Sequence, residues 1–118
     1  MGFDQIANLD IDQTGFGHTL ALISGRYKMV ILYYLVEFEV VRYNELKRAV
    51  KKISHKMLSQ TLKELQSDGL IHREEYQQVP PKVEYSLTEM GKSLMPIINS
   101  MCYWGDDHLK AQPAKNLV

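Results

Sequence analysis

The periodicity of the apolar residues changes at Gly69, and this change constrains the fold more than any other feature of the chain. Before Gly69, a residue suited to a helix N-cap precedes three leucines at helical spacing: Ser54, Leu58, Leu62 and Leu65. After Gly69, residues 70–76 and 83–87 alternate, and the segment between them contains two prolines. A helix repeats every 3.6 residues and a strand every two. The sequence therefore predicts a helix followed by a β-hairpin.

Three further helices are predicted before this one. Residues 18–25 suggest a short helix that stops near the glycine at its end. Residues 27–38 are apolar nearly all round, which favours a buried helix, although their β-branched content leaves a strand possible. Asn44 can cap a third helix, in which Leu46 and Val50 would face the core. A short turn at residues 52–53 would join it to the helix that begins after Ser54.

A last long helix should begin after Thr88, which suits an N-cap. Pro96 lies inside it and should either bend the helix or begin a new one. Its apolar residues fall on one arc of the helix: Met90, Leu94, Ile97, Ile98, Met101 and Trp104. Such a stripe is too large to leave exposed on a monomer, which favours dimerisation through Leu94, Ile97, Ile98, Met101 and Trp104.

This order of elements predicts an α+β fold, a winged helix-turn-helix with a two-stranded β wing and extra N- and C-terminal dimerisation helices. The chain has 118 residues, of which 45% are apolar, enough for one compact domain. We expect an N-terminal arm over residues 1–17, the domain with its C-terminal helix over residues 18–109, and a disordered tail over residues 110–118.

Positive charge is concentrated in one part of a chain whose net charge is zero. Residues 42–63 contain seven of the fourteen Lys and Arg residues and one acid, Glu45, a local charge of +6. Acids outnumber bases on both sides of this segment. The expected partner is a polyanion, and the predicted fold makes that double-stranded DNA.

The helix after Ser54 is the candidate recognition helix. Its exposed side could read bases through Lys56, Ser59, Gln60 and Lys63, with His55 at the flank of its first turn. His55 could equally donate to a phosphate or pack beside the turn. The candidates for contact with the DNA backbone are Arg42, Lys47, Arg48, Lys51, Lys52 and Ser54. At the wing the candidates are Gln77, Gln78 and Lys82. Alone, the helix residues could form an ordinary solvated face, the other cations could serve solubility and the hairpin tip could be polar for no special reason, but the combination favours DNA.

Six short segments in register resemble the HxlR-type transcriptional regulators, a branch of the MarR-like winged-helix proteins. The segments are residues 25–28 (GRYK), 42–46 (RYNEL), 53–58 (ISHKML), 62–73 with its DGLIHR end, 80–91 (PPKVEYSLT and Gly91) and 104–105 (WG). The resemblance implies a cytoplasmic repressor or activator that binds DNA as a homodimer through its N-terminal arm and C-terminal helix. Members that sense electrophiles or oxidants carry a Cys-Pro pair where this chain has Thr14 and Gly15.

Other functions have less support in the sequence. The single cysteine, Cys102, excludes an intrachain disulfide, and without basic neighbours it is more plausibly inert than redox-active. No metal-ligand spacing, nucleophile motif or phosphate-cradling loop is present, so neither an enzyme nor a cofactor is expected. No apolar run is long enough to span a membrane, which agrees with a cytoplasmic protein.

Tyr33 and Tyr34 could line an effector cavity, although core packing is the simpler role. A winged-helix module that binds an acidic protein surface remains the alternative.

Overall fold

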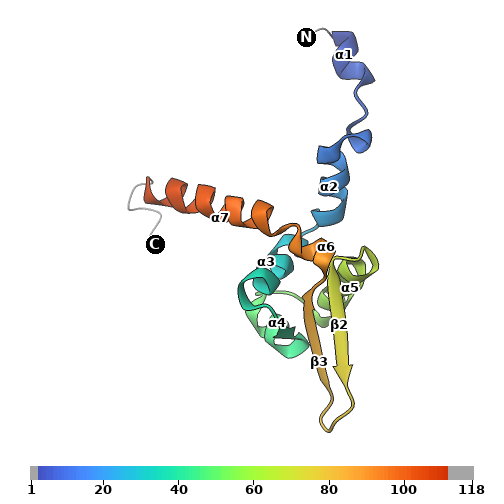
Figure 1. Cartoon of the computed structure of the whole chain (residues 1–118), viewed down its shortest axis with the longest axis vertical. Helices are drawn as coiled ribbons and strands as arrows, with labels where there is room; N and C mark the ends of the chain where they lie inside the picture. Colours follow the sequence, from blue (N-terminus) through green and yellow to red (C-terminus); the bar gives the residue numbers. More distant parts are fainter. Residues whose placement is uncertain (1–2, 112–118) are drawn as a thin grey trace.

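A computed structural model describes residues 3–111 of the chain. The molecule is elongated, with extents of 63 × 41 × 25 Å. Helices α3 to α6 and the β-sheet form a compact body, from which the N-terminal segment and the C-terminal helix α7 project in different directions (Figure 1). These two projecting segments leave apolar surface without cover from the protomer itself.

The predicted N-terminal arm contains helical segments. Helix α1 (Phe3–Asn8) and the short 3-10 helix η1 (Ile11–Gln13) precede α2 (Gly15–Ile23). The hydroxyl oxygen of Thr14 accepts a hydrogen bond from the Gly17 backbone at 3.0 Å and so caps α2. Helix α2 thus begins three residues earlier than the sequence pattern suggested.

Helix α3 (Lys28–Phe38) runs through the middle of the body. Its residues Ile31, Leu32 and Leu35 are fully buried, which the prediction of a buried helix anticipated. The strand alternative for this segment is wrong, because burial on one side of an eleven-residue helix accommodates its β-branched residues without a sheet partner.

Helix α4 (Tyr43–Ala49) follows the two-residue strand β1 (Val41–Arg42). The predicted cap at Asn44 is wrong, because the helix already begins at Tyr43 and Arg42 occupies the N-cap position. There the Arg42 backbone N–H donates to Oε1 of Glu45 at 2.8 Å, which satisfies one unpaired donor at the helix start. Leu46 and Val50 are buried, as predicted.

The turn between α4 and α5 (His55–Ser67) is tight. Lys52 has a φ of 66°, and the next residue, Ile53, is buried in the core. The Ser54 hydroxyl oxygen accepts from the Met57 backbone at 3.0 Å, so the predicted cap of α5 is confirmed. The leucine stripe of α5 is buried, and the helix ends before Gly69, whose φ is 78°.

The hairpin consists of β2 (Ile71–Tyr76) and β3 (Lys82–Leu87), which pair antiparallel with Ile71 opposite Leu87 and Tyr76 opposite Lys82. Strand β1 adds to the other edge of β3, with Val41 opposite Tyr85, which gives the order β1-β3-β2. The predicted two-stranded wing is confirmed, and β1 is an additional strand that the sequence did not indicate. A two-residue strand is too short to show an alternating pattern.

The predicted last helix is two helices. The Thr88 hydroxyl caps α6 (Glu89–Lys92) by accepting a hydrogen bond from the Gly91 backbone at 3.0 Å. Helix α7 (Met95–Lys110) begins at Met95, with Pro96 in its first turn. This confirms that Pro96 begins a new helix, as expected for a residue without a backbone N–H. Lys110, which was predicted to start a disordered tail, closes α7. Residues 112–118 lie outside the described part of the chain.

The hydrophobic core joins α3, α4, α5, the sheet and α7. Its buried members lie on these elements or in the turns beside them: Ile31, Leu32, Leu35, Val41, Leu46, Val50, Ile53, Leu58, Leu62, Leu65, Leu70, Ile71, Tyr85, Leu87 and Ile98. One face of α5 is thus fixed against the body, and the opposite face is left outward. In residues 3–111 no single helix is long and apolar enough to cross a membrane; α2 and α3 reach that length only together, bent by 84° at their junction.

Candidate nucleic-acid interface

The outward face of α5 carries the predicted base-reading residues. Lys56, Gln60 and Lys63 are exposed, and Ser59 is half-buried between them and the body. Their spacing of three, four and seven residues from Lys56 places them on one side of the helix. The buried leucine stripe lies on the other side. The helix therefore presents a polar, cationic strip whose side chains are able to hydrogen-bond base edges.

The Tyr43 side chain connects α4 to the first two turns of α5. Its hydroxyl lies 3.1 Å from Nδ1 of His55 and 3.2 Å from Oγ of Ser59, and it donates to the His55 carbonyl at 3.4 Å. The rings of Tyr43 and His55 stack with an interplanar angle of 10°. His55 therefore packs beside the turn, which is one of the two roles expected for it, and its side chain remains exposed. The sequence did not indicate this role for Tyr43, because no spacing rule relates it to His55 and Ser59.

Gln60 and Glu64 form a hydrogen-bonded pair on the exposed side of α5. Nε2 of Gln60 donates to Oε1 of Glu64 at 3.2 Å, and Nζ of Lys28 lies 3.4 Å from Oε2 of the same carboxylate. Lys28 belongs to α3, so this contact ties the recognition face to the core helix. Neither Lys28 nor Glu64 was a candidate from the sequence.

The predicted backbone contacts surround the start of α5. Arg48, Lys51 and Lys52 are exposed on α4 and the turn, Arg42 is exposed on β1, and Lys47 is half-buried. Within the described part of the chain none of these five cations forms an ion pair with a carboxylate. Their charges are therefore free to act on a polyanion, and the positive potential of the segment is retained in the fold. Ser54 is committed to capping α5.

The cation predicted to contact DNA at the wing, Lys82, already has partners within the wing. Nζ of Lys82 lies 3.6 Å from Oε2 of Glu84 and 4.4 Å from the centre of the Tyr76 ring. Gln77 and Gln78 at the tip are exposed. A DNA contact by Lys82 would have to replace its pairing with Glu84, whereas the two glutamines are available as they stand.

A polar groove of about 410 Å³ separates α5 from the wing. Its lining includes Tyr43, Ser59, Lys63, Gln66, Arg73, Val83 and Tyr85. Arg73, which was not a candidate from the sequence, pairs with Glu75 at 2.7 Å. Burial raises the pKa of the Tyr85 phenol, and its hydrogen bond with Arg73 opposes that rise. The groove combines two cations with hydroxyl groups, which suits the phosphate backbone of a nucleic acid.

The HxlR-like helix-turn-helix family model matches residues 22–113 of the sequence, which include α3, α4, α5, the wing and α7. The chain belongs to the HxlR-like helix-turn-helix family. HxlR-like proteins are DNA-binding transcriptional regulators and not enzymes, and the winged helix-turn-helix fold predicted from the sequence is confirmed.

Relatives within the family support this assignment. An uncharacterised HTH-type transcriptional regulator of Halalkalibacterium halodurans is 54% identical over 96 residues, which cover 81% of this chain and 85% of the relative. The HTH-type regulator YdzF of Bacillus subtilis is 58% identical over 93 residues, covering 79% and 85%. Among solved structures, the redox regulator HypR in its reduced form is 42% identical, with a TM-score of 0.75 over 84% of this chain and all of HypR (100%).

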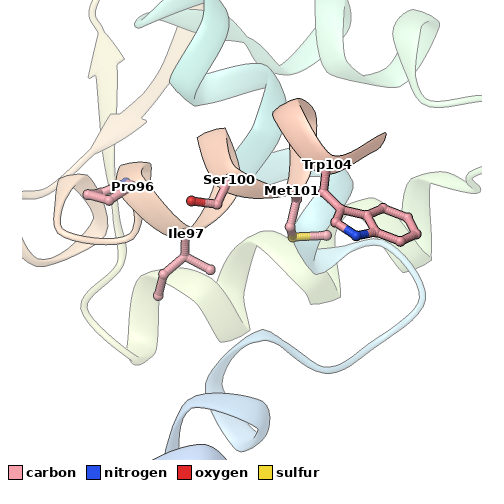
Figure 2. A pocket seen from close by; sticks show the side chains of 5 residues that line it. All are labelled: Pro96, Ile97, Ser100, Met101 and Trp104. Carbon is pink, nitrogen blue, oxygen red and sulfur yellow. The ribbon is translucent and has the colours of Figure 1, made fainter. Parts of the chain in front are cut away.

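In this HxlR-like protein one part of the predicted apolar stripe is buried in the protomer and the other part is exposed. Ile98 is 3% exposed and belongs to the core of the protomer, and Leu94 packs against that core. Ile97, Met101 and Trp104 are 44%, 56% and 71% exposed. They line an open groove of about 670 Å³ with Pro96 and Ser100, and Figure 2 shows them along one side of α7. Of the five residues predicted for a dimer interface, these three remain accessible to a partner.

The sole cysteine of this HxlR-like chain lies away from the N-terminus. Cys102 is half-buried on α7 and lines a pocket of about 340 Å³ with residues of α3, including Tyr33 and Tyr34. Both tyrosines therefore line a cavity, while Tyr34 alone also packs against the core and Tyr33 is exposed. Thr14, at the position where the resemblance placed a sensing cysteine, caps α2 instead.

The described residues offer no site for a metal. In residues 3–111 no group of three or more His, Cys, Asp or Glu side chains is arranged to hold an ion.

Proposed function

We propose that the protein is a sequence-specific transcriptional repressor that acts as a homodimer on a pseudo-palindromic operator. Helix α5 enters the major groove and reads bases with Lys56, Ser59, Gln60 and Lys63. The observation that carries this proposal is the outward face of α5, which is polar and accessible while its other face is fixed in the core. A lysine suits guanine, a glutamine suits adenine and a serine suits either.

The cations around α5 would hold the DNA backbone. Arg42, Lys47, Arg48, Lys51 and Lys52 are free of carboxylate partners, and each phosphate that they neutralise releases counterions. Such contacts set affinity and register without reading sequence. We add Arg73 to the proposed backbone contacts because it lines the groove between α5 and the wing, although a phosphate would have to replace its ion pair with Glu75 at 2.7 Å. His55, Gln77, Gln78 and Lys82 are assigned to flanking contacts.

The homodimer would form through the two segments that project from the body. Ile97, Met101 and Trp104 on α7, and Phe16 and Leu20 on α2, are exposed apolar side chains that a second copy could cover. A two-fold axis would place the two α5 helices about 34 Å apart, one turn of B-DNA. A dimer bound in this way across a promoter would repress it by occlusion.

Selection of full-length protein on a pool of random duplexes tests the proposal. The expected result is one enriched inverted repeat with half-site centres separated by about 10 base pairs, and a footprint on that repeat where it occurs upstream of the gene itself. Enrichment of no sequence, with binding that depends only on salt, would contradict the proposal. That outcome would instead favour a module that docks on an acidic protein surface.

A further inference from the structure

We infer that Glu64 fixes the orientation of the Gln60 amide and thereby makes Gln60 select adenine over guanine. This inference rests on the proposed function, because it assumes that Gln60 faces base edges. It goes beyond that function by naming a residue that determines specificity without touching DNA.

The chemistry of the Gln60–Glu64 pair determines which end of the amide faces the carboxylate. An ionised carboxylate only accepts hydrogen bonds, so the atom 3.2 Å from Oε1 of Glu64 has to be Nε2 of Gln60. The opposite orientation would bring Oε1 of Gln60 against a carboxylate oxygen and lose the hydrogen bond. The pair is four residues apart on one side of α5, a spacing at which helical side chains meet.

Lys28 holds the carboxylate from the other side. Its Nζ lies 3.4 Å from Oε2 of Glu64, and its side chain is only 11% exposed because α3 packs into the body. The two oxygens of Glu64 thus have different partners, one on α3 and one on Gln60. A carboxylate with two partners is less free to turn than the end of an exposed side chain, so the amide of Gln60 is presented in one orientation.

The amide then offers a fixed pattern to the major groove. Nε2 has two hydrogens, and Glu64 uses one of them. The second hydrogen and Oε1 form a donor beside an acceptor, which complements N7 and the N6 amino group of adenine. Guanine presents two acceptors, N7 and O6, so that its O6 would meet Oε1 of Gln60 with repulsion. Without Glu64 the amide could adapt to guanine through its two N–H groups.

Base preference at each position of the selected half-site tests this inference. Wild type, Gln60→Ala, Glu64→Gln and Lys28→Met are compared by competition binding on duplexes that differ at one base pair. Gln60→Ala locates the position that Gln60 reads, where the wild type should favour adenine over guanine by about 5- to 150-fold. Glu64→Gln should reduce that ratio at least about fivefold, because a second amide can accept or donate, and Lys28→Met should reduce it in the same direction.

The control variant is Glu89→Gln, which breaks an exposed pair with Lys92 on α6, 3.3 Å apart, and should leave the ratio unchanged. Thermal unfolding of each variant confirms the fold, and 7-deazaadenine at the same position should weaken binding by wild type but not by Gln60→Ala. The inference would be overturned if Gln60→Ala removes the base preference at a position and Glu64→Gln leaves the adenine-to-guanine affinity ratio there unchanged. That result would leave the proposed function intact. If Gln60→Ala alters no position, the proposed reading of bases by Gln60 fails as well.

Discussion

At the scale of single residues, the Tyr43 hydroxyl is the contact that positions the start of α5. It meets His55 and Ser59, two side chains on the proposed DNA face, from a helix that itself does not read bases. The sequence indicated the recognition face, because the leucine stripe determines which side of α5 points outward. It could not indicate the contacts that Tyr43 of α4 and Lys28 of α3 make with α5, because no local spacing relates residues of separate helices.

Replacing Tyr43 with Phe should weaken DNA binding more than it weakens the fold. The ring and its stacking on His55 remain, while the hydroxyl contacts are lost. One hydrogen bond contributes about 0.5–1.5 kcal/mol net, so we expect affinity for the selected duplex to fall about two- to tenfold. Fluorescence anisotropy titration measures this. Tyr103→Phe, at an exposed position on α7, is the matched control. Equal losses in the two variants would contradict the role given to Tyr43.

Lys52 combines a backbone conformation that suits glycine with a side chain placed for DNA. Its φ of 66° disfavours an L side chain by about 1 kcal/mol. Lys52→Gly should therefore be more stable in urea than Lys52→Ala by about that amount. Both variants should weaken binding to all duplexes and reduce the salt dependence of log K by about one unit. An unchanged salt dependence would remove Lys52 from the phosphate contacts.

At the scale of elements, the helix-turn-helix and the hairpin could be predicted because their signals are local. Ser54, the leucine stripe and Gly69 mark α5, and Thr88 and Pro96 mark the starts of α6 and α7. Strand β1 could not be predicted, because its two residues pair with β3 only through tertiary contact. The division of the α7 stripe also depends on packing, since Ile98 enters the core while Ile97 does not.

The junction between β3, α6 and the end of α5 depends on Gly91. A Cβ on Gly91 would lie 2.0 Å from the carbonyl oxygen of Leu70, which is backbone and cannot turn away. We expect Gly91→Ala to reduce the free energy of unfolding by about 1–3 kcal/mol. At Gly105, in α7, an added Cβ meets no atom within 4 Å, so Gly105→Ala should be neutral or stabilise by about 0.5–1 kcal/mol. Urea denaturation compares the two, and equal effects would mean that α6 does not pack as described.

At the scale of the whole molecule, charge and shape support the same arrangement. The body carries its excess of free cations around the start of α5, and α2 and α7 project from it with exposed apolar side chains (Figure 1). The wing, by contrast, holds its own charges in pairs, including Arg73 with Glu75 and Lys82 with Glu84. We therefore expect the wing to contribute less to affinity than α4 and the turn that follows it.

The proposed dimer predicts the effect of a charge on α7. Met101→Glu places a carboxylate among Ile97 and Trp104 and should convert a dimer into a monomer, because burying an unpaired charge is costly. Affinity for a duplex with two half-sites should then fall by at least about a hundredfold, while affinity for a single half-site is retained. Sedimentation velocity gives the oligomeric state. Tyr103→Glu, off the stripe on the same helix, should remain dimeric, and a monomeric wild type would contradict the proposed dimer.

We expect the outward face of α5 to read bases while the cations around it hold the backbone. The ratio of affinities for the selected duplex and for a random duplex, measured at one salt concentration for Gln60→Ala and Lys51→Ala, tests this expectation most directly. Gln60→Ala should lose about 1–3 kcal/mol on the selected duplex and little on the random one, which lowers the ratio. Lys51→Ala should lose similar affinity on both and keep the ratio. Equal losses on both duplexes for Gln60→Ala would contradict the assignment of α5 as the recognition helix.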